Sequence, residues 1–350
     1  MSAIGNHATE GVRLFDLPQT EARRHLAGGA PVYLTVNPVE YHGPHLSLHN
    51  DRLISLGLIR AMHPLVAPEH PLLLADDVEV GVDPCPGPGT RYTTLPLARR
   101  VVKQACDALA ELGAQRVVIM TFHGSPLHAQ AIEAGLRRLQ RRGLAAINPF
   151  NLLLRTLLDL DPARLAEALA EVPDPVDRAK ITEDFPTDFH AGFGETSLSL
   201  HLAPASVHPG HVHLPPCPPV RPWRLFAGLA RLANVLGAHT LSRELSFIAV
   251  GLGWYDLKPF PAYTSRPHLA SAAVGAQLTR LIVQDAAPLV RAALFERGPS
   301  PKPILGWLRW LSLDGRIGGA KRRQDQVLQP SEAFLAAWPG EPNAPTPAGP

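Results

Sequence analysis

The stretch that decides the expected fold is Val36-Asn37-Pro38-Val39-Glu40-Tyr41-His42-Gly43-Pro44-His45-Leu46. It continues an apolar, β-branched run, residues 32–36, which predicts a buried strand. Glu40 and His42 come just past the carboxyl end of that strand, where open α/β sheets bind their ligands. Because residues two apart in an extended segment point the same way, both side chains are expected to face one cavity.

Imidazole and carboxylate groups in this segment have the composition of a metal site. Metals such as zinc and manganese bind these groups, and a catalytic site needs about three of them plus an open position for water. Glu40, His42 and Asp51 supply such a set. The alternative is a polar loop with surface histidines, but the preceding strand and two further segments described below favour the metal site.

Size and composition indicate a globular protein. The chain has 350 residues, of which 45% are hydrophobic and 18% charged, so it can bury a sizeable core in one large domain. Its formal net charge of +2 creates no strong positive field, and a nucleic-acid partner is not expected. The 3 cysteines include no Cys-x-x-Cys pair, and the first 29 residues lack the pattern of a signal peptide. These features predict a cytoplasmic protein.

Strand and helix patterns alternate along the first half of the chain. Apolar runs at 32–36, 71–75 and 116–122 predict strands, and amphipathic periodicity at 53–62, 97–112 and 127–139 predicts helices. This order predicts a three-layer α/β/α fold with a mainly parallel central sheet. His123 follows the third strand, and Glu195 precedes an apolar run, residues 198–202, that predicts another helix.

Three segments resemble the creatininase (creatinine amidohydrolase) family. Residues 36–46 followed by Asp51 are similar to its signature Gly-Ser-x-Glu-Gln-His-Gly-Pro-His-Leu-Pro, with Tyr41 and Ser47 as departures. Residues 121–126 resemble its Asn-Gly-His-Gly-Gly-Asn segment less closely, and residues 188–197 resemble its His-Ala-Gly-x-x-Glu-Thr-Ser motif. The resemblance implies the family's α/β/α fold and its metal-dependent chemistry.

The ligand set follows from this resemblance. It implies two divalent ions of Zn, Mn or Fe, with Asp51 as the bridge, Glu40 and His123 at one ion, and His42 and Glu195 at the other. The family uses an acidic ligand where this chain has Ser125, and Glu195 is the candidate for that ligand. His190 is the expected proton shuttle, since an imidazole exchanges protons near neutral pH.

The leading hypothesis is a metal-dependent amidohydrolase. It would use a metal-activated water to cleave a nonpeptide C–N bond in a small molecule, such as a cyclic amide or a formamide. Creatinine itself is not favoured, because residues 151–189 lack the tryptophans that cover it in creatininase proper. Two alternatives are a creatininase-like peptidase acting in cofactor maturation and a noncatalytic scaffold or sensor. A homo-oligomer is expected.

The remaining chain predicts additions to this domain. Residues 1–296 form the expected domain, with an insertion at about 204–255, and residues 297–350 form an extension that is expected to be partly disordered. The proline-rich part of the insertion contains His208, His211 and His213, and a solvated loop is favoured over an accessory metal site. Residues 223–255 predict a helical pair acting as a lid, an oligomer contact or a peripheral membrane patch, since scattered charges argue against a transmembrane helix.

Overall fold

The computed structural model describes residues 11–158, 162–296, 298, 301, 305–313 and 327–337. A five-stranded sheet lies at its centre, in the order β1-β3-β2-β4-β5, and all neighbouring strands are parallel. The strands are β1 (Val12–Arg13), β2 (Val32–Asn37), β3 (Leu73–Glu79), β4 (Arg116–Met120) and β5 (Ala145–Ile147). The sheet therefore has the mainly parallel order predicted from the sequence.

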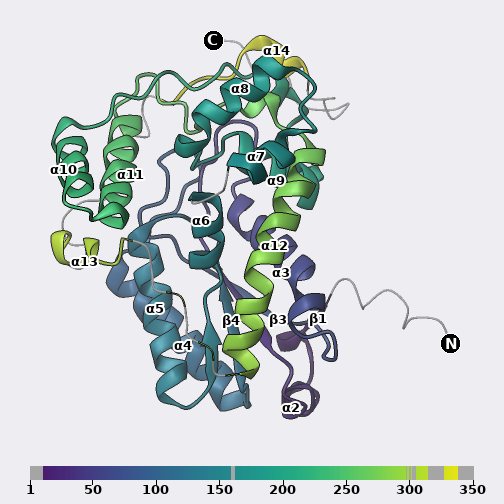
Figure 1. The fold of residues 1–350 in the computed structure, drawn as a ribbon. Coiled ribbons are helices and arrows are strands. Elements are labelled where there is room, and N and C mark those ends of the chain that lie inside the picture. The colour runs from purple at the N-terminus through teal and green to yellow at the C-terminus, as the bar shows by residue number, and fades with distance from the viewer. Residues whose placement is uncertain are drawn as a thin grey trace, which may run out of the picture.

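Helices cover both faces of the sheet, which gives three layers (Figure 1). One face packs against α2 (Gln19–Ala27), α4 (Leu95–Leu112) and α5 (Pro126–Arg141). The other face packs against α3 (Asn50–Val66), α6 (Phe150–Leu158), α7 (Pro162–Leu169), α9 (Phe193–Leu202) and α12 (Ala272–Phe295). Each face of the sheet has its own hydrophobic core, and alternate residues of β2 contribute to the two. Tyr33 packs on the α12 side and Leu34 on the α4 side.

Strand lengths differ from the prediction where the hydrophobic pattern is weak. β3 continues to Glu79 because its polar second half pairs with β2 up to Asn37. β4 ends at Met120, two residues earlier than predicted. The sequence pattern missed β1 and β5, which contain only 2 and 3 residues. Such short strands produce no recognisable periodicity.

The predicted helical pair is present as α10 (Arg224–Val235) and α11 (His239–Tyr255). The two helices lie side by side at the edge of the body in Figure 1 and share a small core of their own around Ala230, Ala233 and Leu245. The outer face of α10 exposes apolar side chains, including Leu225, Leu232 and Leu236. The pair is thus an addition to the sheet domain and contributes no strand.

The proline-rich segment before this pair is packed in part and exposed in part. Val207, His211 and Leu214 are buried, and the ring of His208 stacks on Phe334 of α14 (Glu332–Ala336), whereas Pro209, His213 and Pro215 are exposed. The solvated loop predicted here therefore holds for part of the segment, and α14, from the C-terminal extension, covers another part. The disorder expected in other parts of that extension concerns residues outside those that the structure describes.

A short helix, α8 (Pro175–Asp184), precedes the turn at residues 188–192, and α13 (Leu308–Leu311) lies next to the helical pair (Figure 1).

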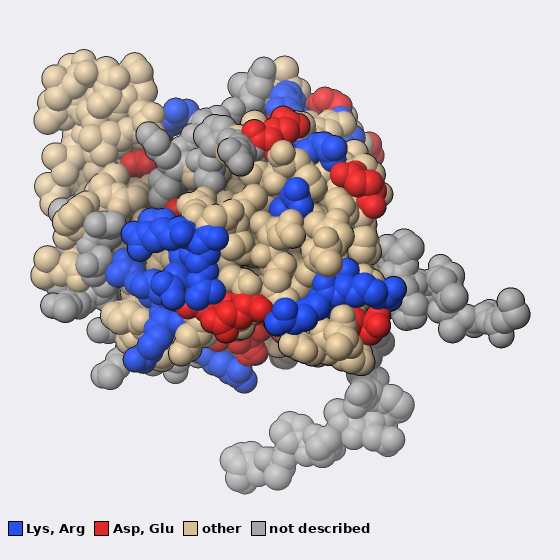
Figure 2. All heavy atoms as spheres, turned by 90° about the horizontal axis from the view of Figure 1, so that it is seen from below, with Lys and Arg blue, Asp and Glu red and all other residues tan. Residues whose placement is uncertain are grey.

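Lys and Arg side chains gather on part of the face seen from below, next to acidic side chains (Figure 2). Between α4 and α5, five cationic side chains and Asp107 line a surface hollow of about 490 Å³, and Asp107 pairs with Arg138 at 2.8 Å. Within the described residues, every helix is too short or too polar to cross a membrane.

Candidate metal centre

Two neighbouring strands deliver the first three side chains of the centre. Glu40 and His42 lie in the loop after β2, and His123 lies just after β4. The Asn37 side chain joins the two strand ends, since its Oδ1 accepts a hydrogen bond from the backbone N–H of Phe122 at 3.1 Å. The loop after β2 and the loop after β4 therefore meet at the carboxyl edge of the sheet, as the sequence predicted.

Two helix starts deliver the remaining carboxylates. Asp51 lies in the first turn of α3, and Glu195 lies in the first turn of α9. The positive end of each helix dipole favours a carboxylate at this position. Asn50 connects the two helices, because its Nδ2 donates to Glu195 Oε1 at 2.8 Å and its Oδ1 accepts from the Ser199 hydroxyl at 2.7 Å.

A tight turn at residues 188–192 orients the side chain of Glu195. The side chain of Asp188 accepts the backbone N–H of Gly194 at 2.7 Å, and the backbone N–H of Ala191 donates to Glu195 Oε2. A Cβ atom on Gly192 would collide with Asp188 and with the backbone of Thr264. Glycine is therefore required for this turn.

The five predicted metal ligands come together in two groups that share Asp51. In one group, His123 Nδ1 lies 2.8 Å from Glu40 Oε2 and 3.7 Å from Asp51 Oδ2. In the other, His42 Nε2 lies 3.3 Å from Asp51 Oδ1 and 3.3 Å from Glu195 Oε1. The two oxygens of Asp51 thus face different histidines.

Backbone carbonyls hold both histidines in a fixed orientation. His42 Nδ1 donates to the carbonyl oxygen of Glu40 at 3.0 Å, and His123 Nε2 donates to the carbonyl oxygen of Val82 at 3.1 Å. The opposite ring nitrogen of each histidine then points toward the carboxylates. This arrangement is common among metal-binding histidines, whose second nitrogen is held by a hydrogen-bond acceptor.

Burial and mutual contact shift the pKa values within this group. Burial raises the pKa of Glu40, but His123 and other histidines outweigh burial and bring it well below its usual range. Burial raises the pKa of Asp51 to about 7. The neighbouring Glu40 carboxylate also raises it, whereas His42 lowers it. Burial lowers the pKa of His123, but Glu40 and Asp51 raise it to about 9. For Glu195, burial raises the pKa, but His42 brings it below its usual value.

The donor set fits divalent cations. Glu40, His42 and Asp51 are each 1–2% exposed, and Glu40 Oε2, His42 Nε2 and Asp51 Oδ2 are buried atoms without a hydrogen-bond partner. Burying three carboxylates together is costly unless positive charge compensates them. These atoms face one another at the centre of the group, so cations held there would satisfy them.

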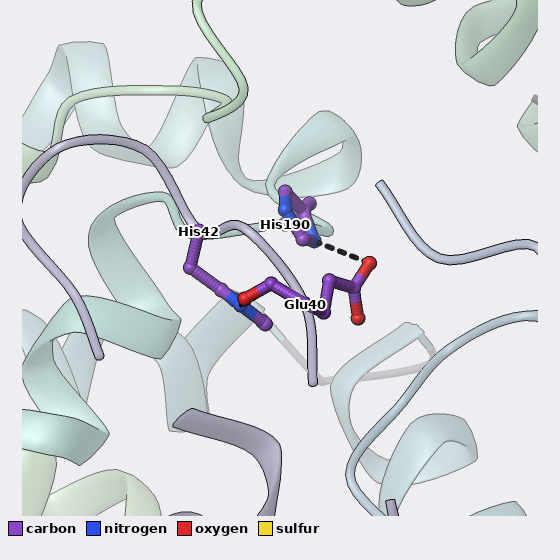
Figure 3. Close-up of side chains that lie close together, drawn as sticks. All are labelled: Glu40, His42 and His190. Atoms are coloured by element: carbon purple, nitrogen blue, oxygen red, sulfur yellow. Dashed lines mark hydrogen bonds and ion pairs between the residues drawn. The ribbon is translucent and has the colours of Figure 1, made fainter. Parts of the chain in front are cut away.

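His190 lies beside this group, on the other side of the loop after β2. Its Nδ1 is 4.0 Å from Glu40 Oε1, as the dashed line in Figure 3 shows, and its ring stacks on His42 with 4.5 Å between centroids. Its Nε2 contacts the carbonyl oxygen of Tyr41 at 3.1 Å. Burial, reinforced by the charge of His42, lowers its pKa. His190 also forms a third candidate group with Glu40 and His42.

Other histidines of the same segments do not join the centre. His45 Nε2 contacts the Thr196 hydroxyl at 3.0 Å, and His49 lies near Glu79 with 41% of its side chain exposed. His211 contacts the carbonyl oxygen of His208 at 3.1 Å. Ser125 caps helix α5 by accepting the backbone N–H of His128. Glu195, rather than Ser125, therefore lies at the centre.

Two supporting residues were not predicted from the sequence. The backbone N–H of Cys85 donates to Glu40 Oε1, and Asn50 supports Glu195 as described above. The residue type at position 85 does not indicate a backbone donor. The position of Asn50 directly before Asp51, however, could have indicated that Asn50 supports the centre. The Cys85 thiol itself is buried and contacts the Pro86 carbonyl.

The sequence matches one family of known proteins. The family model Creatininase, described as creatinine amidohydrolase, matches residues 16–290. The chain belongs to the creatininase family. The matched range includes residues 204–255, the predicted insertion. No curated protein matches the sequence.

Solved creatininase structures share the fold. The structure named "Creatininase Mn" is 20% identical with a TM-score of 0.54, and covers 81% of this chain and 99% of its own. A crystal structure of creatinine amidohydrolase (creatininase) is also 20% identical, with a TM-score of 0.54, and covers 82% of this chain and 99% of its own. A mutant creatininase complexed with creatine is 19% identical, with a TM-score of 0.53 over 81% of this chain and 99% of its own. The creatininase-like α/β fold predicted from the sequence is thus confirmed.

Proposed function

We propose that this protein is a metal-dependent amidohydrolase that cleaves a nonpeptide C–N bond of a small-molecule amide, the class that includes cyclic amides and formamides. The observation that carries the proposal is the position of Asp51 between two histidine–carboxylate groups, one with Glu40 and His123 and one with His42 and Glu195. Membership of the creatininase family supports the same reaction class.

The five residues would hold two divalent ions of Zn, Mn or Fe, with one group of ligands for each. Ions bound at such a pair of sites activate water and polarise a carbonyl group. The carbonyl contacts of His42 and His123 orient each ring so that its other nitrogen would bind an ion. The protein also contributes buried carboxylates that balance the charge of the ions.

His190 is assigned the proton transfer. Its Nε2 hydrogen is donated to the Tyr41 carbonyl, so the lone pair is at Nδ1, on the side of Glu40 and the cavity. Its lowered pKa keeps the ring neutral near pH 7. His190 would accept a proton at Nδ1 from the attacking water and pass it to the leaving nitrogen.

The test combines metal analysis with an activity screen. Protein purified without chelator is expected to contain close to two equivalents of divalent metal, and chelator treatment should abolish hydrolysis of a reactive amide in a panel of cyclic amides, formamides and short peptides. Restoring Mn or Zn should restore the activity. A protein with little bound metal and no turnover on any panel member would instead be the noncatalytic scaffold, whereas preference for the peptides would favour the peptidase alternative.

A further inference from the structure

The cavity at the metal centre extends along α11. Glu40, His123 and His190 lie among its lining residues, and its volume is about 520 Å³. Volumes of about 300–1,000 Å³ are typical of pockets that bury drug-sized ligands. The cavity therefore has room for a group much larger than the amide that reacts.

The walls away from the metal centre are mainly apolar. Helix α11 contributes Phe247, Ile248, Leu252, Trp254 and Tyr255. The indole of Trp254 lies 5.4 Å from the His190 ring, centroid to centroid, and donates a hydrogen bond to the Tyr263 carbonyl, which holds it in place. An aromatic wall thus begins directly beside the proposed proton shuttle.

A second cavity of about 490 Å³ adjoins the first. The two share the lining residues Gly124, Ser125, Pro126, Phe189, Phe247 and Leu305. Phe189 and Phe247 meet edge to face, with 5.4 Å between ring centroids. This aromatic pair lines both cavities, so a long apolar group could pass from the metal centre to the second cavity along it.

Away from the metal positions, the charged side chains of the first cavity disfavour anions. Among the described residues that line it, Glu40, Asp83 and Asp256 carry carboxylates and none is Lys or Arg. Asp256 accepts a hydrogen bond from the Trp223 indole at 2.7 Å. Against the walls away from the metal positions, an anionic group would lose water without gaining a Lys or Arg partner, which is costly. Neutral groups avoid that cost, and cationic groups gain contacts with aromatic faces.

We propose that the substrate is an amide with a bulky apolar or aromatic group that is neutral or cationic, and that α11 is the element that determines this preference. The assignment of the reacting bond rests on the proposed function, whereas the binding preference rests on the cavity alone. The two are therefore tested by separate measurements.

Two glycines of the helical pair provide a matched test. A Cβ atom on Gly251 of α11 would meet no atom within 4 Å, and Gly251 lines the first cavity. Gly228 of α10 is equally open, but it is exposed and does not line either cavity. Gly251→Leu should fill the cavity, and Gly228→Leu should not. Both changes replace glycine by a better helix former, so both variants are expected to fold.

The experiment is isothermal titration of the full chain, as purified and after chelator treatment. The probes are acetamide, N-benzylacetamide, and N-benzylacetamide with a 4-carboxylate or a 4-aminomethyl group. We expect N-benzylacetamide and its aminomethyl derivative to bind at least ten-fold more tightly than acetamide or the carboxylate. Gly251→Leu should lose this preference, and Gly228→Leu should retain it. Phe247→Ala, which removes part of the same wall, should weaken N-benzylacetamide binding in the same way.

Equal or tighter binding of the carboxylate derivative, or unchanged N-benzylacetamide binding in both Gly251→Leu and Phe247→Ala, would overturn the proposal. If the preference holds but no amide is hydrolysed, the proposed function fails and the binding assignment stands. If amides are hydrolysed without any size or charge preference, the proposed function stands and the assignment of α11 fails.

Discussion

His123 Nδ1 lies 2.8 Å from Glu40 Oε2, although the two residues follow different strands of the sheet. The contact exists because β2 and β4 are parallel neighbours whose carboxyl ends open at the same edge. Asp51 Oδ2 lies 3.7 Å from the same nitrogen and comes from the start of α3. The proposed metal site is thus assembled from segments whose positions are set by the core.

Asp51→Asn should remove metal from both positions, because one carboxylate faces both histidines. Metal analysis after desalting should find less than about 0.2 equivalents, against two in the parent, if most of the affinity depends on this bridge. The metal-free variant should be at least as stable as the metal-free parent, since burial disfavours the Asp51 carboxylate and raises its pKa to about 7. Asp76→Asn, on a side chain that is 59% exposed, is the control and should keep both ions. Normal metal content in Asp51→Asn would show that Asp51 does not bridge.

His190→Gln should retain metal while turnover falls. Its ring is proposed to move a proton rather than to bind an ion, and loss of a general acid–base group costs about 100- to 10,000-fold in rate. The rate is measured with the best amide of the panel, and the metal by elemental analysis. His49→Gln, in the sequence segment of Glu40 and His42 but near Glu79, should behave like the parent. Loss of an equivalent of metal from His190→Gln would make His190 a ligand, as its group with Glu40 and His42 would allow.

Asn50→Ala should weaken only the site of His42 and Glu195. It removes the amide that donates to Glu195 Oε1, and loss of a supporting partner of this kind lowers metal affinity by about ten- to a hundred-fold. Competition with a metal indicator should resolve one weakened and one normal equivalent. Ser199→Ala removes the hydroxyl that donates to Asn50 but leaves the Asn50–Glu195 hydrogen bond, so its effect should be smaller. Equal weakening of both equivalents by Asn50→Ala would argue against two separate ligand groups.

Deleting residues 224–252 with a short Gly/Ser bridge should leave a folded, metal-binding protein. The deleted helices pack mainly around their own small core, and all five proposed ligands lie elsewhere. The deletion removes much of the cavity wall and the exposed leucines of α10, so probe binding and the association state should both change. Melting, metal content and size-exclusion chromatography are the measurements. If the deleted protein neither folds nor binds metal, the helical pair belongs to the core of the domain.

The sequence predicted the elements with strong patterns and the residues next to them. Residues 32–36 are mainly apolar and β-branched, so β2 and the direction of Glu40 and His42 after it could be inferred. His190 and Glu195 were found through their motif, and the structure places both beside His42. The roles of these residues remain predictions.

Features that depend on distant packing were not accessible from the pattern. The stacking of His208 depends on Phe334 of α14, which lies far along the chain, and the wall formed by Trp254 requires the helical pair to fold back over the loop after β2. The polar half of β3 carries no strand signal, because its pairing with β2 is made by the backbone and needs no apolar side chains; Asn37 Nδ2 adds a polar contact to Asp77 Oδ1 at 3.2 Å. In each case the deciding contact is made by a partner that the local sequence does not contain.

The origin of the cavity walls has an evolutionary consequence. The proposed ligands come from strand ends and helix starts of the sheet domain, whereas much of the apolar wall comes from α11. Under the proposed role of α11, mutations in this helix would change which compounds fit without touching the ligands. The substrate range could then change while the metal chemistry stays the same.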